Sequence, residues 1–524
     1  MRTILITIVV IFHLFHIRLD AQNKPFSIRL NPIVNTEDGQ QVEILNNKIF
    51  IGAPTNYLVN NVKNIGYTLY LTDMNGKEIK NKFYPNLVSP STNSMSNVTK
   101  DRIFNFAMVN FNELQLERKF VITELNHNLD SLNSLYFKPN GNQLTSCIAQ
   151  YSDSELLTLV IDYNNTNSYL SLIDKTTGAI KWTSKVVDEA IMKCKSFSKI
   201  IVDNDKNILV FNKAVKKGKD IALDTRPLLT KFNNKGQKLF SKDYPEIANA
   251  DYFNSLAILD TATYIFACKG DSDVPGHGGD TIASPPVFYA INKDGSVKWK
   301  KYIYGTYPDG VIQMYGFTVT KNGDIVGIGN KEDNDKKPRT GGWMFRLAHD
   351  GKMKWSRTIR DEKGLSTAKA LIAGELYDVK EGPNGMLYAT GLYMDTFPDY
   401  KPFVNNNNVW LIGVDSMGCF TPNCNDNQIW TSIKDEAIVS VEQPFKVYPN
   451  PAQDRIKVLS LEGFENTDKI TYEIYDLQGQ LISKGIPITQ SDVLDINIAH
   501  LASGAYVLKL QTPKINKSFL FNKI

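Results

Sequence analysis

The chain has 524 residues, of which 42% are hydrophobic and 22% charged, and its formal net charge is +4. A chain of this length has room for more than one domain, and a nearly neutral balance argues against a nucleic-acid-binding surface. No G-x-S-x-G, H-E-x-x-H, Walker or dinucleotide-binding fingerprint occurs, so the sequence predicts no catalytic residues and does not favour an enzyme.

The N-terminus has the pattern of a secretory signal peptide. A basic residue, Arg2, precedes the apolar run ILITIVVIFHLF at 4–15, and small Ala21 stands where a signal peptidase would cut. We therefore expect residues 1–21 to be removed by cleavage between Ala21 and Gln22. No later apolar run approaches the about 18 residues of a membrane helix, so we expect no transmembrane segment in the mature chain.

The middle of the chain repeats one element: a strand, a turn rich in Gly or Asn, and a second strand. Seven copies occur, and turn glycines recur among them, for example at Gly178, Gly236, Gly295, Gly351 and Gly418. The copies are 69–84, 120–137, 169–185, 228–244, 288–305, 343–360 and the degenerate 410–420.

A second hairpin precedes each copy, which gives four strands per repeat. Four-stranded repeats of this period are typical of β-propeller blades, which bury their faces by stacking around an axis. The sequence thus predicts a seven-bladed β-propeller over 22–430. The aromatic residues that recur in the last strand are expected to lie in the core between blades; they are Trp182, Phe240, Trp299 and Trp355.

One loop of the predicted propeller is rich in Asp and Gly. Asp271, Asp273 and Asp280 form a candidate calcium site, because Ca²⁺ prefers oxygen ligands. The alternative is a surface loop whose Asp and Gly residues form turns. The segment 270–306 resembles a blade of uncharacterised Bacteroidota propellers that carry a sorting domain, and that resemblance implies a surface protein without known catalytic residues.

Two of the five cysteines are close in sequence. Cys419 and Cys424 enclose four residues just after the last repeat, and we expect a disulfide, since close pairs tend to oxidise in exported proteins. Zinc binding is the alternative. The remaining cysteines, Cys147, Cys194 and Cys268, lie in apolar strands and are expected to be buried free thiols.

The last 80 or so residues predict a small β-sandwich. Residues 471–476 and 505–510 alternate apolar and polar positions, and Gly479 lies in a tight turn between strands. The segment 431–445 lacks the repeat and is expected to be a linker. The motif residues of the tail are Pro449, Asn450, Pro451, Gly479, Gly504 and Tyr506.

This ordered set of motifs resembles the type A C-terminal sorting domain of Bacteroidota proteins that are exported by the type IX secretion system. The resemblance covers 446–524 and implies that the secretion machinery is a partner and that the protein passes through the periplasm to the outer surface or the medium. The expected fold is all-β, a seven-bladed β-propeller followed by a small Ig-like sorting domain.

The function predicted from this architecture is binding of an unknown ligand, a glycan or a protein, through loops at 214–227, 271–285 and 331–342. One alternative is a secreted hydrolase or lyase that acts on polysaccharides. Another is a structural component of the cell surface or gliding apparatus. Fold alone does not choose among them.

Overall fold

The computed structural model describes most of the chain beyond Lys24, and every element in these residues is a β-strand. The chain divides into two compact units, Met1–Glu436 and Ala437–Ile524. The described residues are 24–30, 36–37, 39–59, 62–85, 87–88, 96–98, 103–110, 118–137, 143–162, 167–187, 192–216, 225–244, 255–269, 285–303, 312–332, 340–361, 374–394, 407–421, 424, 428–431, 434–435, 445–448, 452–460, 470–476, 479–490, 493–511 and 516–524.

In the first unit the described strands form seven sheets, which we number 1 to 7 along the chain. Sheet 1 contains β2 (Thr36–Glu37), β3 (Gln41–Leu45), β4 (Lys48–Val59), β5 (Val62–Asp73) and β6 (Glu78–Pro85). Sheet 2 contains β7 (Leu87–Val88), β8 (Ser96–Val98), β9 (Ile103–Asn110), β10 (Arg118–Leu125) and β11 (Ser131–Phe137). Sheet 3 contains β12 (Gln143–Ser152), β13 (Glu155–Asp162), β14 (Asn167–Asp174) and β15 (Ile180–Lys185).

The remaining sheets follow the same order. Sheet 4 contains β16 (Met192–Val202), β17 (Ile208–Lys216), β18 (Thr225–Phe232) and β19 (Lys238–Asp243). Sheet 5 contains β20 (Ser255–Ile258), β21 (Thr263–Lys269), β22 (Pro286–Asn292) and β23 (Val297–Tyr302). Sheet 6 contains β24 (Ile312–Val319), β25 (Ile325–Glu332), β26 (Thr340–Leu347), β27 (Met353–Asp361) and β31 (Gln428–Thr431). Sheet 7 contains β28 (Gly374–Glu381), β29 (Leu387–Met394), β30 (Asn407–Val414), β1 (Phe26–Leu30) and β32 (Lys434–Asp435).

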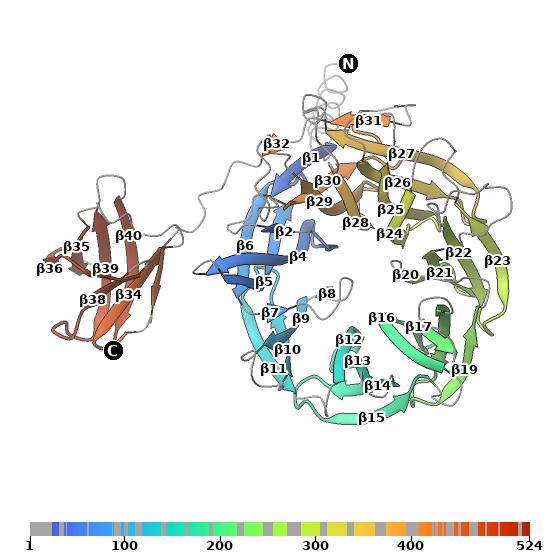
Figure 1. Ribbon diagram of the computed structural model, residues 1–524, viewed down its shortest axis with the longest axis horizontal. Coiled ribbons are helices and arrows are strands. Elements are labelled where there is room, and N and C mark those ends of the chain that lie inside the picture. The colour runs from blue at the N-terminus through green and yellow to red at the C-terminus, as the bar shows by residue number, and fades with distance from the viewer. Residues whose placement is uncertain are drawn as a thin grey trace, which may run out of the picture. The chain divides into compact units, whose positions relative to one another are not determined.

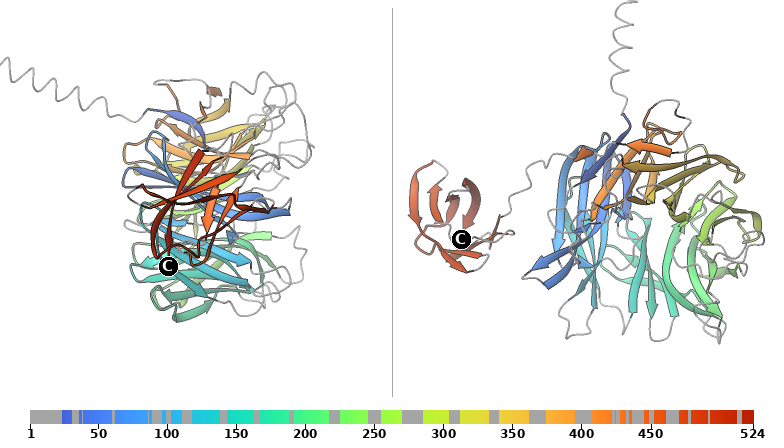
Figure 2. Two further views of the ribbon diagram at one scale, coloured as in Figure 1. Left: turned by 90° about the vertical axis from the view of Figure 1, so that its left-hand side faces the viewer. Right: turned by 45° about the horizontal axis from the view of Figure 1, so that its top comes forward.

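The sheets stand side by side around an axis, as Figure 1 shows, and the unit is a β-propeller. The innermost strands contact one another in a closed series, in the order β3, β8, β12, β16, β20, β24, β28 and again β3. Figure 2 shows the strands running between the two faces of the ring. Each core cluster of apolar side chains lies between two neighbouring sheets, which explains why one four-stranded sheet would be insufficient alone.

The ring is closed by the N-terminal strand. Sheet 7 takes only β28, β29 and β30 from the last repeat, and β1 pairs antiparallel with β30 as its fourth strand, with Phe26 opposite Gly413 and Leu30 opposite Val409. Trp410 in β30 donates its indole N–H to the Ser27 hydroxyl over 3.0 Å. The degenerate last repeat therefore contributes only three strands, and the N-terminal segment supplies the fourth.

Two short strands follow the last repeat and cover sheet edges. β31 pairs parallel with the outer strand β27 of sheet 6, and β32 pairs parallel with β1 of sheet 7. β32 lies inside the stretch predicted as a linker, so the first residues of that stretch pair with the propeller.

One face of the ring, which we call the tight-turn face, carries the short turns before each outer strand. Their glycines have positive φ, for example 75° at Gly236, 82° at Gly351 and 74° at Gly418. In sheets 4 to 7 the aromatic residue of the preceding sheet packs on the turn: a Cβ added at Gly236 would lie 2.7 Å from Trp182, and one at Gly418 would lie 2.9 Å from Trp355. The predicted inter-blade role of these aromatic residues is confirmed.

Sheets 1 and 2 use a different pair of residues at this contact. The turn of sheet 2 has Leu129 with φ 63° in place of glycine, and its side chain is fully buried. The facing strand of sheet 1 has Lys80 at the aromatic position, and its Nζ lies 2.8 Å from Asp130. A larger turn residue thus accompanies the loss of the aromatic ring, and the space between the sheets stays filled.

A group of charged side chains in sheet 6 also contacts sheet 7 at the tight-turn face. Asp324 accepts hydrogen bonds from Arg346 (2.8 Å) and Lys354 (2.7 Å), and Arg346 donates a further bond to the carbonyl of Ser416 in the turn that follows β30. Burial alone would raise the pKa of Asp324, but the hydrogen bonds from Lys354 and Arg346 outweigh it and hold the pKa below its ordinary value. Asp324 is therefore ionised at neutral pH.

The second unit is a sandwich of two four-stranded sheets around one core. One sheet contains β33 (Phe445–Tyr448), β34 (Arg455–Ser460), β38 (Val493–Asn497) and β37 (Ile488–Gln490). The other contains β36 (Leu481–Gly485), β35 (Thr471–Asp476), β39 (Gly504–Gln511) and β40 (Asn516–Lys523). Alternating residues such as Ile456, Ile474 and Leu508 are fully buried between them, as the period-two pattern predicts.

Replacing Gly236 with Ala tests the contact between turn and aromatic ring. The variant adopts a positive φ that costs an L-residue about 1–2 kcal/mol, and its methyl group also meets Trp182. Gly385→Ala is the matched control, because Gly385 has φ 77° but nothing within 4 Å of an added Cβ. We expect Gly236→Ala to lower the free energy of unfolding by about 1–3 kcal/mol more than the control in urea titrations. Equal losses of unfolding free energy in the two variants would contradict a packing role for the contact between Trp182 and the turn at Gly236.

Replacing Asp324 with Asn tests the buried ion pair. The side chains of Asp324 and Arg346 are only 6% and 8% exposed, so removing the carboxylate leaves a buried cation, and we expect a loss of about 3 kcal/mol at pH 7. Because the folded pKa of Asp324 lies below its unfolded value, its contribution is complete above about pH 4 and falls as the pH drops through the folded pKa. Denaturation from pH 7 to pH 2 should show a shallower acid limb for Asp324→Asn. Asp350→Asn, which removes an exposed carboxylate on the same face, should change both quantities much less.

Candidate functional site

A small cavity of about 140 Å³ lies among the innermost strands of the ring, and we call it the axial cavity. Sheets 1, 4, 5, 6 and 7 all contribute to it, so it exists only when the ring is assembled. Its lining residues are Gln40, Gln41, Lys199, Leu256, Ala257, Tyr315, Gly316, Phe317, Thr318, Tyr377, Asp378 and Lys380.

Two tyrosines enter the axial cavity at matching positions of sheets 6 and 7. The pairing register shifts between Met314 and Gly316 in β24 and between Leu376 and Asp378 in β28, which leaves Tyr315 and Tyr377 as the extra residues of two β-bulges. Bulges redirect a side chain, and here the two rings meet edge to face with centroids 5.0 Å apart.

Each of these tyrosines is held by the residue two positions before it. The Tyr315 hydroxyl donates to Gln313 Oε1, and the Tyr377 hydroxyl donates to Glu375 Oε2, both over 2.8 Å. Gly316 permits the close approach of the two strands, since an added Cβ would lie 2.8 Å from the Tyr377 carbonyl oxygen. The pair is thus fixed before any ligand arrives.

The carboxylates around the axial cavity are already engaged. Glu43 Oε1 lies 3.2 Å from Lys380 Nζ, and Asp378 Oδ2 accepts the Val42 amide over 3.0 Å. Glu375 accepts from Tyr377 and from the Asn330 amide. Burial alone would lower the pKa of Lys380, but the negative charges of Asp378 and Glu43 outweigh it and raise the pKa above its ordinary value. Lys380 is therefore charged and neutralised.

Two polar groups of the axial cavity have no protein partner. Lys199 in β16 is partly exposed to the cavity and forms no hydrogen bond or ion pair in the part of the chain that the structure describes. Gln40 precedes β3, and its Oε1 is buried without a hydrogen-bond donor. An unpaired cation and an unpaired acceptor in one cavity leave room for a ligand that supplies both partners.

A larger depression of about 350 Å³ lies on the outer wall between sheets 4 and 5. Its floor is formed by Tyr244 and Tyr289, which are buried, and the Tyr244 hydroxyl donates to the Gly295 carbonyl over 3.1 Å. Its lining comes from the outer strands and turns of these two sheets, so we regard it as the seam between two blades.

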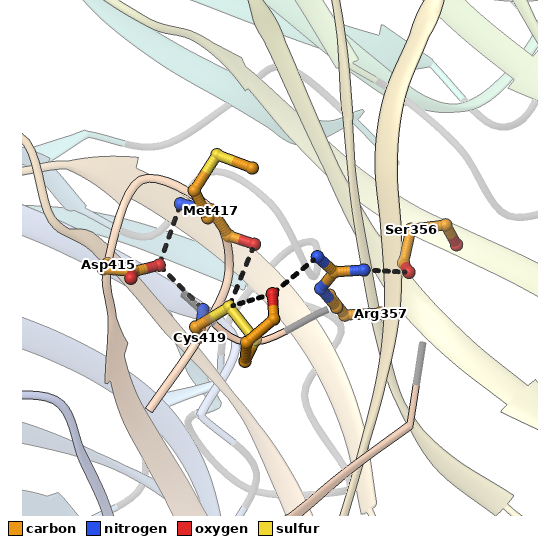
Figure 3. The surroundings of a disulfide bond; sticks show 6 residues. Ser356, Arg357, Asp415, Met417 and Cys419 are labelled. Atoms are coloured by element: carbon orange, nitrogen blue, oxygen red, sulfur yellow. Dashed lines mark hydrogen bonds between the residues drawn. A yellow bond between two sulfur atoms is a disulfide. The ribbon is translucent and has the colours of Figure 1, made fainter. Parts of the chain in front are cut away.

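The disulfide predicted between Cys419 and Cys424 is present, with the two Cα atoms 5.9 Å apart (Figure 3). Asp415 Oδ1 accepts the amides of Met417 and Cys419, both over 2.8 Å, which fixes the turn after β30. The Arg357 guanidinium in β27 donates to the Cys424 carbonyl. The bond therefore anchors the chain where it leaves sheet 7 for the edge of sheet 6.

Several predicted site residues lie outside the described residues. These are the cleavage residues Ala21 and Gln22, the candidate calcium ligands Asp271, Asp273 and Asp280, and the motif residues Pro449, Asn450 and Pro451. Within the described ranges, no three His, Cys, Asp or Glu side chains are arranged to hold a metal ion. Cys147 and Cys268 are buried free thiols, as predicted, and Cys194 lies in β16.

The other motif residues have clear roles in the sandwich. Gly479 has φ 85° and donates its amide to the Asp476 carbonyl in the turn between β35 and β36, as the sequence predicts. Gly504 begins β39, and Tyr506 is buried with its hydroxyl 2.9 Å from the Ala502 carbonyl. These residues shape the fold of the tail and gather no chemistry of their own.

Residues 446–520 match the family described as the secretion system C-terminal sorting domain. The protein is a type IX secretion substrate. Its tail implies recognition by the type IX machinery and export to the cell surface or the medium. No curated protein is similar in sequence to the chain. Among the described residues, no helix has the length and apolar character needed to cross a membrane.

Solved structures with a similar arrangement include the β-propeller domain of the Trilobed protease from Pyrococcus furiosus, with 10% identity over 73% of this chain and 94% of that one and a TM-score of 0.41. BamB from Moraxella catarrhalis has 13% identity over 75% of this chain and 99% of that one, with a TM-score of 0.36. Acylaminoacyl peptidase from Pyrococcus horikoshii has 12% identity over 82% of this chain and 59% of that one, with a TM-score of 0.42. Similarity this low says nothing about function.

Proposed function

We propose that the protein is an exported binding module: a seven-bladed β-propeller that holds an extracellular ligand, carried to the surface by an Ig-like sorting domain. The seven sheets and the closed series of inner strands support the blade count. A signal peptide over 1–21 takes the chain to the periplasm, the propeller begins at 22, and a linker after β32 leads to the sorting domain from 446.

The observation that carries this proposal is the difference between the two faces of the ring. Consecutive strands are antiparallel, so the turns between the first and second strands and between the third and fourth strands lie on the tight-turn face. The second strand ends, and the third begins, at the opposite face. Several of the connections between second and third strands are long; they span 217–224, 270–285, 333–339 and 395–406. Loops mounted at one end of a rigid scaffold are where proteins place their binding residues.

The hydrolase or lyase alternative has one observation in its favour, the carboxylates and tyrosines around the axial cavity. A catalytic carboxylate must reach substrate, but Glu43, Glu375 and Asp378 are bound by Lys380, by Tyr377 and Asn330, and by the Val42 amide. Binding therefore fits the geometry better than turnover.

Binding and turnover are separated by presenting the exported protein with arrays of glycans and surface proteins and then analysing the bound material for products. We expect retention of at least one ligand without cleavage. Replacing 270–285 with a Gly-Ser linker should weaken that retention at least tenfold, whereas Asn234→Ala on the tight-turn face should leave it unchanged. Release of shortened glycan chains would instead support the hydrolase or lyase.

Removing the sorting domain should separate folding from export. We expect residues 1–445, expressed in the native host, to accumulate in the periplasm with the propeller folded, because each blade face is covered by a neighbouring blade. Cell fractionation and cooperative unfolding of the purified protein measure the two effects. The full-length chain is the control. Normal delivery of 1–445 to the surface or the medium would contradict the export role of the tail.

A further inference from the structure

We propose that the axial cavity binds a carboxylated sugar unit, with its carboxylate on Lys199 and a hydroxyl group on Gln40. This inference rests on the proposed binding function and names the ligand class for one part of the ring. It uses two polar groups of the cavity, Lys199 and the Gln40 side-chain oxygen, that have no partner among the described residues.

Lys199 selects a ligand that has a negative charge. The other described cation of the cavity, Lys380, is neutralised by Glu43 and Asp378, whereas Lys199 meets no carboxylate among the residues that the structure describes. An ammonium group that is partly removed from water favours an anion as a partner, and a hydrogen bond to a charged group contributes more than one between neutral groups. A neutral ligand would leave this charge uncompensated.

Gln40 requires a hydrogen-bond donor on the same ligand. Its Oε1 is buried and accepts no hydrogen bond, although its backbone amide is paired with the Gly52 carbonyl over 3.0 Å. A buried acceptor without a donor is costly, and a ligand hydroxyl would satisfy it. A simple inorganic anion has no such group, so the pair of residues favours a ligand that is an anion and a donor together.

The walls of the cavity fit the rest of a sugar unit. Tyr315 and Tyr377 are fixed through their hydroxyls and present their rings to the cavity, while Leu256, Ala257 and Phe317 provide further apolar surface. With about 140 Å³, the cavity holds one unit and not a longer stretch of chain. The unit is either a free sugar acid or the terminal uronic acid of a glycan.

Calorimetry on the full-length exported protein tests this assignment with D-glucuronate as the probe and D-glucose as the neutral control. We expect glucuronate to bind at least tenfold more tightly than glucose, Lys199→Met to remove that preference, and Lys199→Arg to retain it. Gln40→Leu should weaken glucuronate binding several-fold. Lys235→Met, which removes an exposed lysine on the tight-turn face, should change nothing.

A uronic-acid-terminated disaccharide distinguishes the two sources: tighter binding than the monosaccharide indicates a glycan end, and equal binding indicates a free sugar acid. Equal affinity of the wild-type protein for glucuronate and glucose would overturn the assignment without reliance on any variant, as would full affinity in Lys199→Met. If glycan arrays still retain the protein after either of these outcomes, the proposed binding function is supported and only the assigned ligand class is wrong. Absence of every ligand would overturn both.

Discussion

The pairing of β1 with β30 is the contact on which the ring depends. A row of blades leaves an apolar face exposed at each end, and only closure brings those two faces together. Leu30 in β1, Ile51 in sheet 1 and Leu411 in sheet 7 are fully buried in the core cluster that closure creates. Burial of each such side chain contributes about 1.5–3 kcal/mol, so the closing strand stabilises both ends of the chain of blades.

Once closed, the ring is kept in register by contacts that repeat from sheet to sheet. Turn glycines admit the aromatic residues of the preceding outer strand, and β1 continues this pattern because Phe26 packs on Gly76. Where the pattern changes, at Leu129, the facing residue changes with it. Such matched packing fixes the inner strands, and the axial cavity is consequently lined by side chains from five sheets in set positions.

The axial cavity was not predictable from spacing or motif, because its residues come from strands far apart in the chain. A partial signal existed: Tyr315 and Tyr377 each lie five residues before a turn, at Thr320 and Gly382, so an alignment of the repeats places them together. Nothing similar marked Lys199. Lys199 has no partner among the described residues, and that property belongs to the assembled ring.

The sequence alone determined the strands, the turns with positive φ, the disulfide between Cys419 and Cys424 and the sorting tail, because alternation, turn chemistry and short-range spacing act within a few residues. Only the tertiary structure decided how the ring closes and which polar groups remain unpaired at its centre. The fourth strand of sheet 7 is β1, hundreds of residues from β30, and pairing over such a separation is specified by complementary buried surfaces that no local pattern records.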